Sequence, residues 1–207
     1  MRDIVLATNN QGKLDEARKI LLPRGYNVLS LKDVGVINFN PEEIGETFLD
    51  NAVLKAKLLL QLIPNSCVFA DDSGLEVEAL EDRPGVRSAR YCEGTDTDRC
   101  EKILEEMQGK ENRKAAFVCS VAFYCKQVSF ALSARCEGEI GTEMKGENGF
   151  GYDPIFVRNG KCFGEMTQQE KNKCSHRAGA MLQMANYLDD IVKKGLFLGS
   201  FERDVRQ

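Results

Sequence analysis

Short apolar segments alternate with longer amphipathic segments along the 207-residue chain, and this alternation limits the folds open to it. Apolar runs predict strands at 4–7, 26–31, 67–70, 75–80, 155–157 and 161–163. Helical spacing of apolar residues predicts helices over 13–22, 47–62, 98–109 and the second half of 167–195. Two longer runs, 115–124 and 128–140, predict an antiparallel hairpin. Strands and helices mixed in this order favour an α/β fold with a mixed sheet.

Composition and charge exclude several functional classes. Hydrophobic residues make up 43% and charged residues 29% of the chain, as in folded globular proteins. The formal net charge of −4 argues against a polymeric nucleic acid as partner, because neutralising its phosphates requires clustered Lys and Arg. A small anionic ligand needs only a local positive pocket. We expect no signal peptide or membrane span, because no apolar run approaches the ~18 residues that would cross a bilayer.

The cysteines indicate a reducing environment. None of the eight belongs to a C-x-x-C pair, which disfavours a zinc ribbon or a thioredoxin-type site. Several lie within apolar strand patterns, such as Cys119 in "AFVCSVAFY", where a thiol packs as a small hydrophobe. We therefore expect reduced thiols and a cytoplasmic location.

The stretch "CVFADDSGLEV" (67–77) places two carboxylates directly after an apolar run. Burying an unpaired carboxylate is costly, so Asp71 and Asp72 either lie in a solvated turn between two strands or hold a cation. Magnesium usually takes one or two carboxylates together with phosphate and water oxygens. One carboxylate could bind the metal while the other accepts a proton from water. Glu42 and Glu43 in "NPEEIGE" add further acidic groups.

Two segments carry lysines that could meet a phosphate. "ATNNQGK" runs from a predicted strand into a helix that opens near Lys13, a geometry that presents backbone N–H groups to an anion. It is not a P-loop, because Ala7 replaces the first glycine and Leu14 the Ser or Thr. An ordinary strand-to-helix turn remains the alternative. Lys55 follows Asn51 by four residues, so both lie on one face of their predicted helix, although a lysine at such spacing is usually solvent-exposed.

Two later segments have features of a nucleotide-base site. In "GFGYDP", glycines at 149 and 151 flank Phe150, which could stack on a base, or the segment could form an ordinary turn before Pro154. "KNKCSHRAG" contains His176, the single histidine of the chain, and Ser175 is a plausible helix N-cap. One histidine excludes a His-rich metal site, and the lack of a G-x-S-x-G elbow disfavours a serine-hydrolase triad.

Five segments occur together in an order and spacing that resembles a known family. "TNNQGK", "ETFLDNAVLKA", "ADDSGLEV", "GFGYDPIF" and "EKNKCSHRAGA" are similar to motifs of the inosine triphosphate pyrophosphatase family, the noncanonical purine NTP pyrophosphatases of the Ham1 or RdgB type. The resemblance runs from Ile4 to about Leu188. It implies a long twisted mixed sheet flanked by helices, in two lobes with a central active-site cleft. We expect one such domain over 1–195 and a C-terminal extension at 196–207.

The same resemblance implies an activity and its residues. Family members are homodimers that use Mg²⁺ to hydrolyse ITP, dITP and XTP to the monophosphate and pyrophosphate. By resemblance Asp72 is the general base, and the metal ligands are Glu42, Asp71 and Asp72, with Glu43 an alternative to Glu42. The residues expected to bind substrate are Thr8, Asn9, Asn10, Gln11, Gly12, Lys13, Lys55, Ser73, Phe150, Gly151, Tyr152, Asp153, Lys171, His176 and Arg177.

Base preference would follow from hydrogen-bonding groups. The 6-keto oxygen of hypoxanthine or xanthine can accept from the imidazole of His176 or the guanidinium of Arg177. The 6-amino group of adenine would instead face another donor, a mismatch that can reject a substrate by on the order of 10⁴-fold. Two other readings remain open: a related pyrophosphatase acting on other modified nucleotides, and a nucleotide-binding module without turnover.

Overall fold

A computed structural model describes residues 1–126 and 128–195, so the expected extension at 196–207 lies outside the described residues. The helices are α1 (Gln11–Leu21), α2 (Phe48–Leu62), α3 (Asp96–Glu106), α4 (Gln168–Lys171) and α5 (His176–Lys193). The strands are β1 (Arg2–Leu6), β2 (Tyr26–Leu29), β3 (Val68–Val77), β4 (Arg83–Pro84), β5 (Lys114–Tyr124), β6 (Ser129–Ile140), β7 (Phe156–Arg158) and β8 (Lys161–Cys162).

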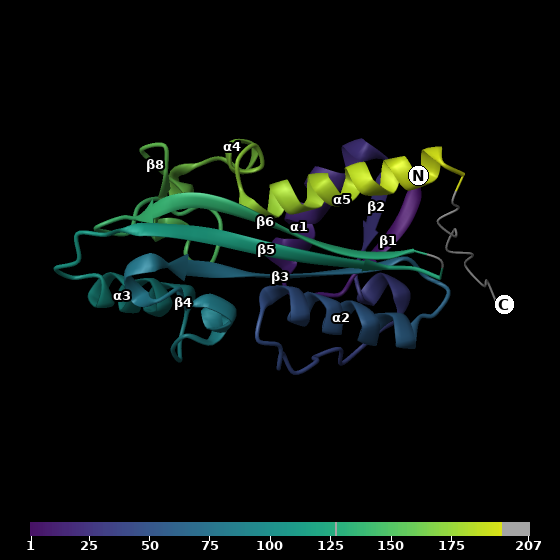
Figure 1. Ribbon diagram of the computed structural model, residues 1–207, viewed down its shortest axis with the longest axis horizontal. Coiled ribbons are helices and arrows are strands. Elements are labelled where there is room, and N and C mark those ends of the chain that lie inside the picture. Colours follow the sequence, from purple (N-terminus) through teal and green to yellow (C-terminus); the bar gives the residue numbers. More distant parts are fainter. Residues whose placement is uncertain (127, 196–207) are drawn as a thin grey trace. The chain divides into compact units, whose positions relative to one another are not determined.

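The strands form one mixed sheet, as the alternation of segments predicts. Their order is β2-β1-β3-β5-β6-β7-β8, with β4 paired to β3. β1 runs parallel to β2 and β3, whereas β4 is antiparallel to β3, and β6, β7 and β8 pair antiparallel in succession. The α/β fold with a twisted mixed sheet flanked by helices is confirmed, including the predicted neighbours β5 and β6 (Figure 1).

One local prediction is wrong. The segment around Asp71 and Asp72 is not a turn between two strands, because β3 continues without interruption from Val68 to Val77. Both aspartates lie inside this strand, with exposed fractions of 1% and 6%. The physical reason is that each carboxylate has a lysine partner from another element, which offsets part of the cost of burying it.

The chain divides into two compact units that share several elements. Unit 1 consists of Met1–Asp72, Ser120–Ser133 and the described residues from Ala180 onward, and unit 2 of Ser73–Cys119 and Ala134–Gly179. The boundaries therefore fall inside β3, β5, β6 and α5. The expectation of a single domain of two lobes around a cleft stays a prediction.

Each unit has its own apolar core. In unit 1, α2 packs Ala52, Ala56 and Leu59 against one face of the sheet, where it meets Val5 and Val68. α5 lies over the opposite face of this part of the sheet (Figure 1). In unit 2 the core residues come from α3 and from β3, β5, β7 and the segment after β8, including Leu75, Cys100, Ile103, Phe117, Phe156 and Phe163.

The helices begin where the sequence provides caps. Thr47 and Asp50 form a capping box at the start of α2, with Asp50 N donating to Thr47 Oγ1 and Thr47 N to Asp50 Oδ2. Ser175 caps α5 by accepting from Ala178 N. On α5, Ala178, Met181, Ala185 and Leu188 are buried, whereas Val192 is half-buried and Leu182 is exposed. Among residues 1–126 and 128–195, no helix combines the length and apolar character needed to span a bilayer.

Candidate functional site

Five charged side chains gather in unit 1, and we call them the lysine–carboxylate cluster: Lys13, Glu43, Lys55, Asp71 and Asp72. Lys13 Nζ lies 3.1 Å from Asp71 Oδ2. Lys55 Nζ lies 3.1 Å from Asp72 Oδ1 and 2.7 Å from Glu43 Oε1. Each aspartate therefore has a lysine of this chain as a cationic partner, and a metal ion at these carboxylates stays a prediction.

Strand and helix geometry explains how these groups meet. Residues two apart in a strand share a face, and Asp71 and Asp72 are consecutive in β3, so each meets a lysine from a different helix. Lys13 also acts electrostatically on Asp72, and Asp71 on Lys55, which places the two ion pairs in one cluster. Ala70, on the same face as Asp72, packs in the core that α2 covers, and α2 supplies Lys55. Lys13 extends from the first turn of α1 to reach Asp71.

Asn51 belongs with this cluster, although the sequence interpretation does not assign it to the site. Its Nδ2 donates to Asp72 Oδ2 at 3.1 Å, and its side chain is fully buried. The signal that could have identified it is its spacing, since Asn51 and Lys55 lie one turn apart on the same face of α2.

The structure distinguishes Glu42 from Glu43. Glu42 is exposed, whereas Glu43 is partly buried and contacts Lys55. The cluster thus contains three carboxylates (Glu43, Asp71 and Asp72) and two ammonium groups (Lys13 and Lys55), a balance of one negative charge when all are ionised.

Burial and neighbouring charges tune the titration of the two central groups. Burial raises the pKa of the Asp72 carboxyl above its ordinary value and Glu43 adds to this, although Lys55, Lys13 and Asn51 act in the opposite direction. Burial lowers the pKa of Lys55, but the surrounding carboxylates outweigh it and leave that pKa raised. Lys55 is thus a firmly charged cation, and Asp72 is a stronger proton acceptor than an exposed aspartate.

The carboxylate oxygens of the lysine–carboxylate cluster are the kind of ligand that a hard divalent cation prefers. Within the described residues, no group of three His, Cys, Asp or Glu side chains forms a ready-made metal site. Magnesium does not require one, because it commonly takes one or two protein carboxylates and completes its shell with phosphate and water oxygens. The surplus negative charge of the cluster favours such an ion.

The segment "TNNQGK" (8–13) leads from a loop into the first turn of α1. Asn10 caps the helix by accepting from Lys13 N at 3.1 Å, and Thr8 Oγ1 accepts from Asn10 N at 3.1 Å. Asn9 Nδ2 donates to Phe39 O at 2.5 Å, which ties the loop to the segment before α2. Gln11 instead bonds Asp15 along the helix. The helix N-terminus beside Lys13 can meet an anion through backbone N–H groups and a full positive charge.

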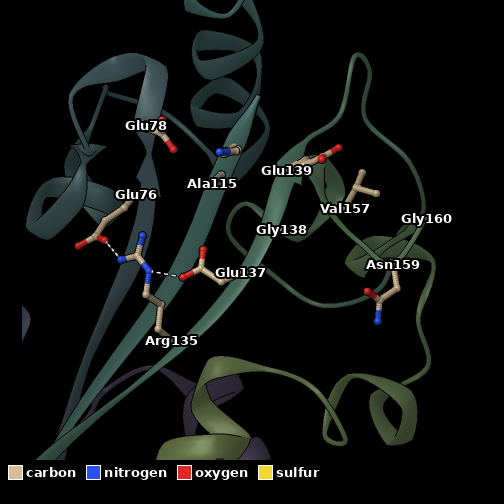
Figure 2. A pocket seen from close by; sticks show the side chains of 11 residues that line it. Glu76, Glu78, Ala115, Arg135, Glu137, Gly138, Glu139, Val157, Asn159 and Gly160 are labelled. Carbon is tan, nitrogen blue, oxygen red and sulfur yellow. Dashed lines mark hydrogen bonds and ion pairs between the residues drawn. The ribbon is translucent and has the colours of Figure 1, made fainter. Parts of the chain in front are cut away.

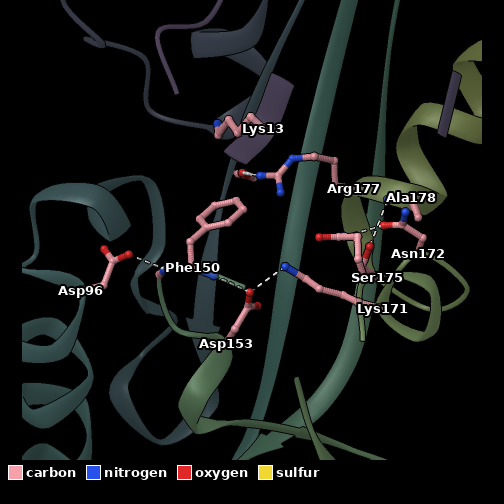
Figure 3. Close-up of polar contacts among 12 residues, drawn as sticks. Lys13, Asp96, Phe150, Asp153, Lys171, Asn172, Ser175, Arg177 and Ala178 are labelled. Carbon is pink, nitrogen blue, oxygen red and sulfur yellow. Dashed lines mark hydrogen bonds and ion pairs between the residues drawn. The ribbon is translucent and has the colours of Figure 1, made fainter. Parts of the chain in front are cut away.

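A second set of predicted residues meets in unit 2, and we call it the aromatic–basic cluster: Ser73, Phe150, Asp153, Lys171 and Arg177. Figure 3 shows the last four of these side chains. Lys171 Nζ donates to Asp153 Oδ2 at 2.6 Å, and both side chains are almost fully buried. The Lys171 ammonium lies 4.9 Å from the centre of the Phe150 ring, and the Arg177 guanidinium lies 5.3 Å from it. Arg177 also donates to Ser73 Oγ at 2.7 Å.

Several contacts hold the "GFGYDP" loop in shape. Asp153 Oδ2 accepts from Phe150 N at 2.9 Å, and Gly149 has a φ of +81° with no room for a side chain beside that carboxylate. Asp96, in the first turn of α3, accepts from Gly151 N at 2.7 Å. Asp96 is a positioning residue that the sequence did not indicate, because it lies 55 positions from its partner.

Tyr152 and His176 point to other partners within unit 2. Tyr152 Oη donates to Ser88 O at 2.9 Å. The His176 ring stacks on Phe117, with centroids 4.6 Å apart and an interplanar angle of 17°. Tyr152 is therefore part of the loop support, while His176 is held as the first residue of α5 by an aromatic platform.

A pocket of about 600 Å³ on unit 2 is a poorer candidate for an anionic substrate (Figure 2). Its charged lining consists of Glu76, Glu78, Glu137, Glu139, Lys114 and Arg135, which sum to two negative charges. Arg135 is already paired with Glu76 and Glu137. None of the predicted substrate or metal residues lines this pocket.

Comparisons with known proteins agree on one family. The sequence profile described as "Ham1 family" matches residues 4–187. A dITP/XTP pyrophosphatase of Bacillus subtilis is 42% identical over 91% of this chain and 98% of its own length. A dITP/XTP pyrophosphatase of Halalkalibacterium halodurans is 44% identical over 91% of this chain and 100% of its own length.

Solved structures give the same result. The Ham1 protein of Staphylococcus aureus superposes with a TM-score of 0.82 at 36% identity, covering 91% of this chain and 99% of its own. A HAM1 protein from Coxiella burnetii has the same TM-score and identity and covers 92% of this chain and 100% of its own. The similarity thus extends over nearly all of both chains.

Proposed function

This chain belongs to the Ham1 family, and on that premise we propose that its lysine–carboxylate cluster carries out the cleavage of a nucleoside triphosphate. The chain is a hydrolase of acid anhydrides, a pyrophosphatase of noncanonical purine nucleotides. We propose ITP, dITP and XTP as its substrates and the monophosphate and pyrophosphate as products. The observation that carries the proposal is the contact of Lys55 with both Asp72 and Glu43 in a buried setting.

Each residue of the cluster has a proposed task. Lys13 and the N-terminus of α1 bind phosphate oxygens, and Lys55 stabilises the charge that develops as the pyrophosphate leaves. Asp72 accepts a proton from the attacking water, a role that its raised pKa supports. Both lysines are held at their places by carboxylates before substrate arrives. Binding energy is therefore not used to order them.

We propose magnesium as the cofactor, held by Asp71, Asp72 and Glu43 in place of the predicted Glu42. When bound, magnesium would supply positive charge against the phosphate oxygens. The excess of one carboxylate over the two lysines supports this assignment, and the exposure of Glu42 disfavours it as a ligand.

The aromatic–basic cluster of unit 2 is proposed to read the base. Phe150 offers a ring face, and His176 and Arg177 offer donors for a 6-keto oxygen. Asp153 and Lys171, paired with each other, are proposed to support this surface. The alternative of a module without turnover is disfavoured by the buried proton acceptor and its lysine, because binding alone does not require them.

A pyrophosphate-release assay tests the proposal. The full chain is given ITP, dITP, XTP, ATP, GTP, dATP, CTP and UTP, each with and without magnesium. Rapid release from the first three, at rates far above ATP and GTP and only with magnesium, is the expected result. Preferential release from a pyrimidine nucleotide would instead support a pyrophosphatase of other nucleotides, and no release from any of them would support a binding module.

The proposal also covers the oligomeric state and the cellular location. We propose a homodimer, as the family resemblance implies, which sedimentation of the full chain would test. We propose a cytoplasmic location, supported by eight cysteines without a disulfide.

A further inference from the structure

We propose that Asn51 is a positioning residue that sets the orientation of the Asp72 carboxylate and joins it to the acidic loop that carries Glu43. The inference deepens the proposed function and rests on the role of Asp72 as proton acceptor. Asn51 touches neither water nor phosphate in this role. It acts through Asp72.

The two oxygens of Asp72 are engaged by two residues of one helix. Asn51 Nδ2 donates to Oδ2 at 3.1 Å, and Lys55 Nζ donates to Oδ1 at 3.1 Å. Asn51 and Lys55 lie one turn apart on α2, so the helix presents two donors at a fixed spacing. A carboxylate held at both oxygens cannot rotate about its Cβ–Cγ bond, and its remaining lone pairs keep one direction.

The other end of the Asn51 amide holds the acidic loop. Gly45 N donates to Asn51 Oδ1 at 2.8 Å, and Glu43, two residues earlier, contacts Lys55. A primary amide is required for both tasks, because one atom must accept from Gly45 and the other must donate to Asp72. An aspartate at position 51 could only accept, and an alanine could do neither.

The fit around Asn51 explains the glycine at position 45. A Cβ at Gly45 would lie 2.7 Å from Asn51 Oδ1 and 2.9 Å from Asn51 N. The loop therefore approaches the helix closely only because residue 45 has no side chain. The methyl group of Gly45→Ala should displace the Asn51 amide and disturb its hydrogen bond to Asp72, while both side chains keep their own chemical groups.

Loss of this orientation should lower turnover more than substrate binding. Removing a residue that orients a reactive group typically costs about 10–100-fold in activity. Lys13 and the N-terminus of α1 keep their own contacts in an Asn51 variant. We therefore expect kcat for ITP to fall by about 10–100-fold, while KM changes by less than about threefold.

The test compares wild type, Asn51→Ala, Asn51→Asp, Gly45→Ala, Asp72→Asn and the Asn51→Ala/Asp72→Asn double variant in one pyrophosphate-release assay with ITP. Gln61→Ala, an exposed amide on the same helix, is the matched control. Melting temperatures are measured alongside, so that kcat is expressed per folded enzyme. Asn51→Asp retains the shape of the side chain and its acceptor for Gly45 N, so it remains informative if Asn51→Ala does not fold.

The expected outcome is that Asn51→Asp is impaired at least as strongly as Asn51→Ala, and that Asn51→Ala costs nothing further once Asp72 is Asn. An Asn51→Asp variant with wild-type kcat would overturn the inference, because the amide would then serve only the loop. Equal losses from Asn51→Ala in both backgrounds would also overturn it. Wild type without activity on ITP refutes the proposed function instead, and an active Asp72→Asn refutes both.

Discussion

Lys55 Nζ lies 3.1 Å from Asp72 Oδ1 and 2.7 Å from Glu43 Oε1, so one buried ammonium of unit 1 joins a carboxylate of β3 to a carboxylate of the loop before α2. This arrangement explains how an apolar strand can continue through two aspartates. It also makes the cluster sensitive to any change in its charge balance.

Lys55→Met should expose that sensitivity. The substitution keeps the length of the side chain but leaves three carboxylates with a single ammonium. Breaking a buried ion pair from one side typically costs about 3–5 kcal/mol, and we expect the free energy of unfolding in metal-free buffer to fall by that order. Magnesium should restore part of the loss, since a cation can replace the missing charge.

Urea titrations of Lys55→Met with and without magnesium measure both effects. Lys57→Met, exposed on the same helix, serves as the control and should lose far less stability. If magnesium left the stability of Lys55→Met unchanged, the cluster would not be the cation site.

Gly149→Ala should disorganise the loop that carries Phe150. Gly149 has a φ of +81°, and a Cβ there would lie 2.0 Å from Asp153 Oδ2, the acceptor for Lys171 and Phe150 N. A strained backbone residue costs about 1–3 kcal/mol, and we expect a loss of stability of that order and a higher KM for ITP. Gly141→Ala, whose nearest atom would be 3.4 Å away, should change neither. A wild-type KM for ITP in Gly149→Ala would show that this loop does not contribute to substrate binding.

His176→Ala should weaken discrimination between bases. The ring of His176 is held by stacking on Phe117, and it is buried. Removing one donor to the 6-keto oxygen should reduce the preference for ITP over ATP by about tenfold. Comparing kcat/KM for the two nucleotides measures it, with His176→Gln as a variant that keeps a donor. An unchanged ratio in His176→Ala would remove this residue from base reading.

Acid stability should depend on Asp189 in unit 1. Asp189 accepts from Arg24 at 2.6 Å and from Tyr26 Oη at 2.7 Å. Burial alone would raise the pKa of Asp189, but these bonds outweigh it and lower that pKa below the ordinary 3.8. The unfolded state therefore binds the proton first as pH falls. The stability that Asp189 provides is complete above pH of about 4 and is lost as pH drops through the lower folded-state pKa.

Urea unfolding from pH 7 to pH 2.5 tests this. The free energy of unfolding of Asp189→Asn should fall less steeply below pH 4 than that of wild type. If the free energies of unfolding of Asp189→Asn and wild type fell in parallel below pH 4, Asp189 would not contribute to the loss of stability in acid.

The sequence predicts local features well and distant partners poorly. The capping box at Thr47, the N-cap at Ser175 and the β7–β8 pair follow from short-range patterns, and all three are present. The prediction of a turn at Asp71 and Asp72 is wrong because two adjacent carboxylates are normally solvent-exposed. Their burial depends on lysines of α1 and α2, which lie far away in the sequence. Glu43 could not be separated from Glu42 for the same reason.

In the candidate site, too, the sequence indicates individual residues but not their partners. Motif resemblance identified Lys13, Lys55, Asp153 and Lys171 by position, but not that Asp153 and Lys171 pair with each other. Asn51 was noted for its helical spacing with Lys55, yet its bond to Asp72 depends on how α2 packs on β3. Those pairings are properties of tertiary packing, which no short stretch of sequence contains.

The most direct measurement is the rate of pyrophosphate release from ITP by Asp72→Asn, with saturating magnesium and nucleotide. The variant keeps the size of the side chain but loses the proton acceptor, so kcat should fall by at least about 10²-fold while the nucleotide still binds, as shown by equilibrium titration. A variant that binds ITP and releases pyrophosphate at the wild-type rate would contradict the assignment of Asp72 as the base.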